Sequence, residues 1–594
     1  MPAHFFHRLL LLFIFSITAT YNGLAVASTA STLALTTPTV ATPLVKARRA
    51  QIAAALKQSD PLIMLPASTA KLDKNQTIAQ TVALTEPRVK ALTIGQPGNR
   101  PLLVEVFGIY PLRPSDITEP IAPCKTSTCY RVEIYAYAAN ATFMVFVNTA
   151  TKKVVNMATV PRTQPDIPEH LTKLALEIAT ESPQVAAALG GKPGTDKALM
   201  ASTKTSLNRT RCERSRHLCV APTFVQGERA LWAIVDLTDL RLVGTRWTEV
   251  GKTAGAAAPV RAVTEARLQN EVITETFCEK ETSLARNGWS FDYMLTSSDG
   301  LRVANAKFNG APVFDSVKLV DWHVSYSRTD AFGYSDAVGC PYFSQSAVIA
   351  AEPPRVEDIA KDGKNIGFAL VQHYWSEGWP TPCNYHYIQR NEFYNDGRFR
   401  PMAASVGRGC GNDGTYRPVT RIAFSDAGNF GEWDGKAWSA WAKERWQLAD
   451  EKTATTTEGF RYRFSSGADQ GMYITPSKGQ FGDGGRGDSP YVYVTRTAAD
   501  RDEGASDLPT LGPCCNTNHE QGPEKFINNP PESITNSKLV LWYVPVLKND
   551  NREGKEYCWA NSVIENGLVE PKMFPCFSGP MITPFGLNNQ AAAK

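Results

Sequence analysis

The sequence has no long apolar run beyond its N-terminus, no block of basic residues and no Cys-x-x-Cys pair, and each absence argues against one class of protein. Beyond residue 27 no stretch approaches the ~20 consecutive apolar residues of a membrane helix, so we expect no membrane span. The formal net charge is only +4 and lysine and arginine form no block, so we expect no nucleic acid among the partners. No Cys-x-x-Cys pair occurs, which argues against a structural zinc site.

The N-terminus has the three parts of a secretory signal peptide. A weakly basic start at 4–8 precedes an apolar run at 9–17, and small residues at 25–27 offer a cleavage site. The apolar run is too short to cross a bilayer. We therefore expect residues 1–27 to be removed and the protein to be secreted, extracellular or periplasmic.

Cysteine usage agrees with export, because all twelve cysteines follow the signal peptide and an oxidising compartment favours disulfides. Spacing predicts two local bridges and one wider bridge: Cys124–Cys129, Cys212–Cys219 and Cys558–Cys576. The adjacent Cys514 and Cys515 are expected to pair elsewhere.

The first third of the chain predicts a linker followed by two small α+β domains. Residues 28–100 read as a Ser/Thr/Ala-rich linker and loose segment, with one short helix at 46–58. Residues 101–190 combine strand patterns with a helical period over 168–189, which predicts an α+β domain. A second small α+β domain is expected at 191–268, with its clearest strand pair at 230–247.

From 269 to the end at 594, the pattern is that of a large antiparallel β-sandwich. Helical periods vanish, and short alternating runs are separated by Gly, Pro, Asn and Asp clusters. The glycine-rich stretch 482–490 predicts an exposed loop.

The segment 381–387 reads Thr-Pro-Cys-Asn-Tyr-His-Tyr and resembles the cofactor motif of the copper amine oxidases, Thr-x-x-Asn-Tyr-Asp/Glu-Tyr. Further segments resemble parts of that family in the same order: 288–291, 300–301, 309–313, 334–336, 393–397, 493–496, 536–543 and 575–577. The resemblance runs from about 280 to 580 and implies the family's catalytic sandwich.

The resemblance implies roles for five residues. Tyr385, after Asn384, stands where the family oxidises a tyrosine to topaquinone. Asp336 stands at the position of the catalytic base, Tyr334 at the gate, and Tyr326 at the tyrosine that hydrogen-bonds the quinone. A buried carboxylate suits such a base because burial raises its pKa. The implied reaction oxidises a primary amine with O₂ and water to an aldehyde, ammonia and peroxide.

The family's copper ligands are missing from this sequence. The family holds copper with a His-x-His pair and a later histidine, since imidazole nitrogen suits copper. Here Tyr416, Pro418 and Asn549 occupy these positions, and no histidine follows His519. The resemblance therefore implies no copper and no topaquinone unless another metal site serves. One alternative site combines three other histidines, His323, His373 and His386, with Tyr385 or Tyr416.

Two further hypotheses concern short-range features. A Cys340–Cys383 disulfide would tie the segment of the base to the strand of Tyr385. The Arg-Gly-Asp-Ser-Pro run at 486–490 resembles an integrin-binding sequence, which makes an adhesion module an alternative function.

Three functions remain open from the sequence. The first is a secreted, non-catalytic descendant of the amine oxidases that binds or supports something else. The second is a primary-amine oxidase that forms a quinone from Tyr385 with altered metal chemistry, and the third is a new enzymatic use of the cavity. The resemblance also implies a homodimer.

Overall fold

The computed structural model describes residues 40–586 except 68–69, 96–99, 114–116, 118, 214–215, 252–263, 327–331, 342–347, 468, 478–487, 499–506, 509–510 and 512–518. The expected signal peptide and the Cys514–Cys515 pair lie outside the described residues. Among the described residues, no helix has both the length and the apolar character that a membrane crossing requires.

The first unit is a five-stranded sheet covered by helices. Its strands, in sheet order, are β1 (Leu62–Ile63), β4 (Val104–Pro111), β5 (Cys129–Ala136), β6 (Ala141–Asn148) and β7 (Lys153–Pro161). Among the described residues, three helices and one small strand pair precede β4: α1 (Pro43–Ala55), α2 (Lys74–Thr85), α3 (Pro87–Ala91), β2 (Ile94–Gly95) and β3 (Arg100–Pro101). Small residues of α2, such as Ala79 and Ala83, let it pack closely on Val106 and Ile134 of the sheet.

The expectation of a loose segment within 28–100 is wrong for residues 74–91, which form α2 and α3. Asp73 caps α2: its carboxylate accepts the backbone N–H of Gln76 at 2.7 Å, and the Gln76 side chain accepts the N–H of Asp73 at 2.9 Å. Such a capping box satisfies two N–H groups that helix ends leave free. The helix forms because of this cap and its small apolar face, although its amphipathic pattern is weak.

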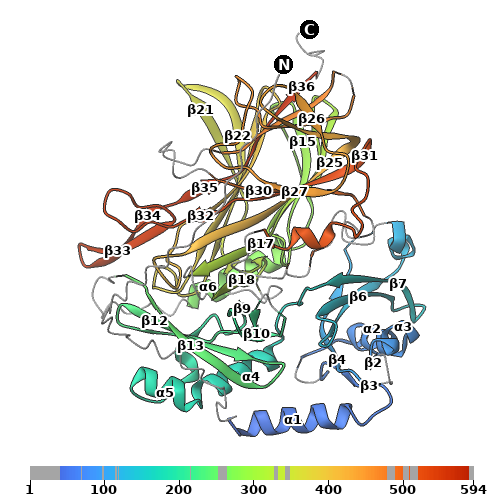
Figure 1. Cartoon of the computed structure of the whole chain (residues 1–594), viewed down its shortest axis with the longest axis vertical. Coiled ribbons are helices and arrows are strands. Elements are labelled where there is room, and N and C mark those ends of the chain that lie inside the picture. The colour runs from blue at the N-terminus through green and yellow to red at the C-terminus, as the bar shows by residue number, and fades with distance from the viewer. Residues whose placement is uncertain are drawn as a thin grey trace, which may run out of the picture. The chain divides into compact units, whose positions relative to one another are not determined.

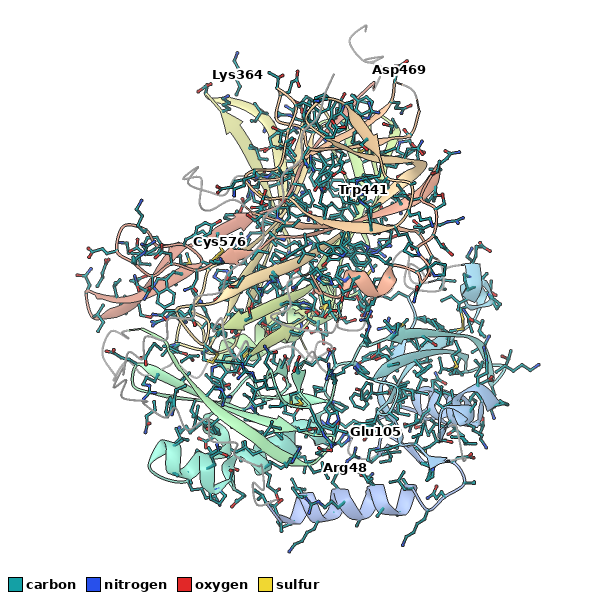
Figure 2. All side chains as sticks on the ribbon, in the orientation of Figure 1. Arg48, Glu105, Lys364, Trp441, Asp469 and Cys576 are labelled. Carbon is teal, nitrogen blue, oxygen red and sulfur yellow. A yellow bond between two sulfur atoms is a disulfide. The ribbon has the colours of Figure 1, made fainter. Side chains whose placement is uncertain are left out.

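Helix α1 is tied to the first sheet by a buried ion pair. Arg48 Nη1 donates to Glu105 Oε1 at 2.9 Å, and both side chains are at most 5% exposed. Figure 2 shows the two labelled side chains pointing toward each other. The expected helix at 46–58 is therefore part of the folded unit and begins three residues earlier.

The second unit combines two helices with a small sheet. Its elements are α4 (Glu169–Thr180), α5 (Pro183–Leu189), β8 (Ala198–Leu199), β9 (Lys204–Ser206), β10 (Cys219–Val220), β11 (Thr223–Gln226), β12 (Arg229–Asp236) and β13 (Arg241–Glu249). The helical period over 168–189 is divided in two at Pro183, because proline starts a helix better than it continues one. Helix α4 lies against β12 and β13 (Figure 1).

The large β region consists of two sheets that share the long strand β25 (Thr415–Trp433) and are antiparallel except for one short parallel pair in the second sheet. The first sheet contains β14 (Thr282–Arg286), β15 (Trp289–Leu295), β16 (Leu301–Phe308), β17 (Ala311–Tyr326), β18 (Phe332–Asp336), β27 (Arg445–Leu448), β30 (Tyr491–Arg496), β31 (Ser537–Val544) and β32 (Leu547–Lys548). The second contains β19 (Val338–Gly339), β20 (Val348–Ala350), β21 (Arg355–Lys361), β22 (Lys364–Trp375), β23 (His386–Tyr394), β24 (Phe399–Ser405), β26 (Trp438–Ala440), β28 (Tyr462–Ser465), β29 (Gly471–Thr475), β35 (Cys576–Ser578) and β36 (Met581–Phe585). Strands β33 (Trp559–Glu565) and β34 (Leu568–Phe574) form a separate hairpin.

Aromatic side chains fill the space between the two sheets. Trp289 of β15 packs on Phe393 of β23 with ring centroids 5.2 Å apart, and Phe291 stacks on the same ring at 4.4 Å. Trp322 of β17 stacks on Tyr387 of β23 at 4.1 Å. Aromatic rings bury a large apolar area and here hold the two layers face to face. The predicted fold class, α+β units followed by a large antiparallel β-sandwich, is confirmed.

The second unit shares a sheet with the sandwich. Strand β9 pairs with β18, with Thr205 opposite Tyr334. Helix α6 (Thr264–Thr276) spans the predicted cut between 268 and 269. The boundaries at 101–190, 191–268 and 269–594 therefore stay a prediction.

Candidate functional site

Tyr385 lies buried just before β23. Its backbone N–H donates to the Ser376 hydroxyl at 2.9 Å, and its own hydroxyl lies 2.7 Å from that of Tyr326. The Tyr326 hydroxyl also accepts the backbone N–H of Cys410 at 2.7 Å. Both tyrosines are fully buried, and burial raises the pKa of each phenol well above its ordinary value. The two phenols are therefore neutral over the physiological range.

Five tyrosines gather around this hydrogen bond, and we call them the tyrosine cluster: Tyr326, Tyr334, Tyr385, Tyr387 and Tyr416. The rings of Tyr385 and Tyr387 lie 5.4 Å apart, and those of Tyr334 and Tyr416 meet Tyr385 edge-on at 6.4 and 6.5 Å. Register explains part of this arrangement, since Tyr334 and Tyr416 both pair with Val324 of β17, one from each side.

Asp336 contacts this cluster through Tyr387. Its Oδ2 accepts the Tyr387 hydroxyl at 3.0 Å, and its Oδ1 has no hydrogen-bond partner in the part of the chain described. Burial raises the pKa of Asp336 to about 8, with the nearby Asp321 acting in the same direction. A carboxyl group with such a pKa exchanges a proton near neutral pH, which is the property a general base needs.

Tyr334 is held by side chains of the second unit. Its hydroxyl is hydrogen-bonded to the Thr223 hydroxyl, and its ring stacks on Trp232 with centroids 4.2 Å apart. Both partners come from the β11–β12 hairpin. Any gating movement of Tyr334 would have to break this bond and this stack.

Asn384 has a local role in the turn before β23. Its Nδ2 donates to the Thr381 hydroxyl at 2.9 Å and to the Pro382 carbonyl at 3.1 Å. The asparagine of the motif thus stabilises the turn that presents Tyr385.

The residues at the expected copper-ligand positions do not form a copper site. Tyr416 is buried, which raises its pKa to about 12 and keeps it protonated, and Pro418 has no donor atom. Asn549 offers only a neutral amide, whose Nδ2 and Oδ1 are buried without a partner among the described residues. Since copper prefers imidazole and thiolate ligands, this donor set does not fit the metal.

Tyr416 and Asn549 both lie beside Gly414. A Cβ atom added to Gly414 would lie 3.2 Å from the Tyr416 ring and 3.4 Å from Asn549 Oδ1. The space at Gly409 is tighter still, because its Cβ would lie 2.2 Å from the Tyr326 hydroxyl and 2.5 Å from that of Tyr416. Protein atoms occupy the space around these hydroxyls.

The proposed Cys340–Cys383 disulfide is wrong. Cys383 pairs with Cys410, and Cys340 pairs with Cys278. The prediction paired Cys340 with Cys383 because they are close in sequence to Asp336 and Asn384. The true partner of Cys383 is Cys410, which follows β24 and reaches Cys383 only once β23 and β24 have paired. The three bridges predicted from spacing are confirmed.

The three-histidine site proposed from the sequence does not form. His323 lies beside Asp321 Oδ2 at 3.2 Å and Gln521 Oε1 at 3.4 Å. His373 and His386 instead meet each other, with 2.9 Å between Nδ1 and Nε2.

The aspartate of the Arg-Gly-Asp run is buried. Asp488 is 0% exposed, and its Oδ2 accepts the Tyr543 hydroxyl at 2.7 Å and the backbone N–H of Gly579 at 3.0 Å. A receptor that reads this carboxylate cannot reach it in this conformation, so the structure argues against the adhesion hypothesis. Arg486 and Gly487 lie outside the described residues.

Comparisons with known proteins give a likeness of structure only. No protein-family model and no curated protein matches the chain. The chain is similar to a copper-containing benzylamine oxidase from Hansenula polymorpha (11% identity, 82% of this chain and 94% of that one, TM-score 0.45). It is also similar to a lysyl oxidase from Pichia pastoris (10% identity, 86% of this chain and 89% of that one, TM-score 0.45). A third similar structure is an amine oxidase from Aspergillus nidulans (11% identity, 86% of this chain and 88% of that one, TM-score 0.38). At this identity and TM-score the likeness carries no argument about chemistry, which rests on the residues described above.

Sequence reasoning missed several residues that build the site: Thr223, Trp232, Trp322, Ser376 and Cys410. None belongs to the matched motifs, and each contacts the cluster only through tertiary packing. Cys410 alone left a signal, as an unassigned cysteine in a chain rich in disulfides.

Proposed function

We propose that this chain is a secreted protein that keeps an amine-oxidase-like sandwich as a non-catalytic scaffold for binding or assembly. The observation that carries the proposal is the lack of imidazole at the expected copper-ligand positions. These positions hold Tyr416, Pro418 and Asn549, which offer copper no imidazole. Oxidation of Tyr385 to a quinone therefore lacks its metal.

Secretion is part of this proposal. The N-terminal signal pattern supports it, and so do the five disulfides among the described cysteines. The homodimer implied by the resemblance also belongs here, and sedimentation of the mature chain tests it.

A second function, amine oxidation with altered metal chemistry, is favoured by Asp336. Its raised pKa and its link through Tyr387 to Tyr385 are features that a scaffold has no need to keep. This alternative requires a metal source that the ligand positions do not offer.

One experiment decides between these two functions. The mature protein is purified, stained for redox-cycling quinone and compared with Tyr385→Phe and with Tyr473→Phe, a matched change far from the motif. The scaffold proposal expects no stain in any of the three. A stain that disappears only in Tyr385→Phe would overturn it and establish the oxidase.

A further inference from the structure

His373 and His386 face each other from neighbouring antiparallel strands. In the register of β22 and β23, Trp375 lies opposite His386 and Ile388 lies opposite His373, so the two histidines are diagonal neighbours on one face. Nδ1 of His373 and Nε2 of His386 are 2.9 Å apart.

As a hydrogen-bonded pair the two rings are incompletely satisfied. His386 is only 3% exposed, and its Nδ1 has no partner in the described structure. A neutral imidazole carries one N–H and one lone pair, so either assignment of the proton leaves a buried group of His386 unmet. An ion bound at Nε2 places the proton on Nδ1, so the pair is satisfied no worse with an ion than with a hydrogen bond between the rings.

The spacing of the two nitrogens is that of two ligands on one metal ion. Two bonds of about 2.0–2.1 Å at a right angle place their nitrogen atoms about 2.9 Å apart. The planes of the two rings are tilted by 36° to each other. To bind one ion together, the two lone pairs must point to a common point beside the line between the nitrogens, and the half-buried ring of His373 has the room to rotate toward it. Its partial exposure also gives an ion access from solvent.

The surroundings keep both rings unprotonated. Burial lowers the pKa of His373 and lowers that of His386 to about 3, so protons do not compete for the nitrogens near neutral pH. The carboxylates nearest to His373 are Glu352 and Glu357, and each is already paired with an arginine, Arg355 and Arg390. Trp375 stacks on both rings, at 5.3 Å from His373 and 4.6 Å from His386.

We propose that His373 and His386 form a two-histidine site for a divalent transition-metal ion, with Cu²⁺ bound more tightly than Ni²⁺ or Zn²⁺. Imidazole ligands suit all three ions, and the order follows their general affinity series. His386 directly follows Tyr385 in the chain, and the proposal holds whether or not the chain oxidises amines.

A second group of possible ligands is already neutralised. His217, Asp236 and Asp239 lie within reach of one ion, but Asp239 is paired with Arg211 and with Arg241. Asp236 Oδ1 accepts two backbone N–H groups of the following turn. This group therefore serves as a turn cap, in contrast to the histidine pair.

The test is a titration of the mature chain with Cu²⁺, followed by calorimetry and by tryptophan fluorescence. We expect one equivalent to bind and to quench part of the emission, because Trp375 lies against both ligands. In His373→Phe the affinity falls by more than about tenfold, since loss even of a residue that supports a ligand costs that much. His519→Phe is the matched control, because His519 also stacks on a tryptophan, Trp446, at 4.6 Å.

The proposal would be overturned if His373→Phe still bound one equivalent of Cu²⁺ with the wild-type affinity, or if the wild-type chain bound none. His373 is preferred to His386 for the test because its partial exposure spares the fold, and His386→Gln serves as a second variant wherever its thermal unfolding matches that of the wild type. The quinone stain is a separate readout, so failure of this site and failure of the scaffold proposal are distinguishable.

Discussion

The hydroxyl of Tyr326 bridges the hydroxyl of Tyr385, 2.7 Å away, and the backbone N–H of Cys410, also 2.7 Å away. Cys410 is in turn bonded to Cys383, two residues before Tyr385. The chain segment that carries Tyr385 is thus fixed at its backbone by a disulfide and at its phenol by Tyr326. This closed loop of contacts leaves Tyr385 little freedom to turn.

We predict that Tyr385→Phe lowers the free energy of unfolding by about 1–2 kcal/mol, because it removes one buried hydrogen bond and leaves Tyr326 less satisfied. Urea unfolding measures this loss. Tyr135→Phe is the matched control, since it removes a hydroxyl bonded to Asn140 at 2.8 Å in the first unit. Unchanged stability in Tyr385→Phe would contradict the structural role given to the phenol.

The raised pKa of Asp336 predicts a dependence of stability on pH. Its folded-state pKa of about 8 lies above the ordinary value near 4, so the folded chain binds the extra proton between these values. Stability from this group is complete below about pH 4 and is lost as pH rises toward 8. Asp336→Asn keeps an acceptor for Tyr387 and has no charge to bury, so it is expected to lose less stability over this range.

The comparison is the difference between the unfolding free energies of Asp336→Asn and the wild type from pH 4 to 9. Asp488 and Glu524, whose pKa values burial raises to about 7, affect both chains equally and cancel in this difference. A difference that is flat across the range would show that Asp336 is ionised in the folded protein at all these pH values.

The sequence predicted the sandwich and much of the cluster, since periodic strands and the 381–387 motif are local patterns. It did not predict α2, whose signal was the Asp73 cap and not a strong amphipathic period. It also gave Cys383 the wrong partner, because the choice among several cysteines depends on how β23 and β24 pair. The burial of Asp488 was equally out of reach, since its partners Tyr543 and Gly579 are distant in sequence.

The two disulfides Cys383–Cys410 and Cys124–Cys129 are predicted to differ in their contribution to stability. Their sequence separations are 27 and 5 residues. Loop-closure entropy then gives roughly 3.5 kcal/mol for the first and roughly 2 kcal/mol for the second. Paired Cys→Ser variants of each bridge, compared by urea unfolding, test this order. Equal losses would mean that residual structure in the unfolded chain dominates.

The burial of Asp488 predicts that cells do not adhere to this protein through its Arg-Gly-Asp run. On surfaces coated with the folded protein, cell attachment is expected to be no greater than on an inert protein and to be insensitive to a soluble Arg-Gly-Asp peptide. Protein unfolded in urea before coating is the internal control, because it frees Asp488 from Tyr543. Attachment to the folded protein that the peptide blocks would restore the adhesion hypothesis.

The contact between Thr223 and Tyr334 gives a test that distinguishes the scaffold proposal from the oxidase alternative. Thr223→Val keeps the shape of the side chain and removes the hydroxyl that Tyr334 contacts, so a structural role predicts a loss of about 1–3 kcal/mol in unfolding free energy. Thr245→Val, at an exposed hydroxyl bonded to Gln184 at 3.3 Å, is expected to cost less than about 0.5 kcal/mol. In the oxidase reading the same bond restrains a gate, so its loss would instead raise the rate of amine turnover. A structural role changes the free energy of unfolding, whereas a gating role changes the rate of peroxide release. Measuring both quantities on Thr223→Val and Thr245→Val therefore decides which role Tyr334 has.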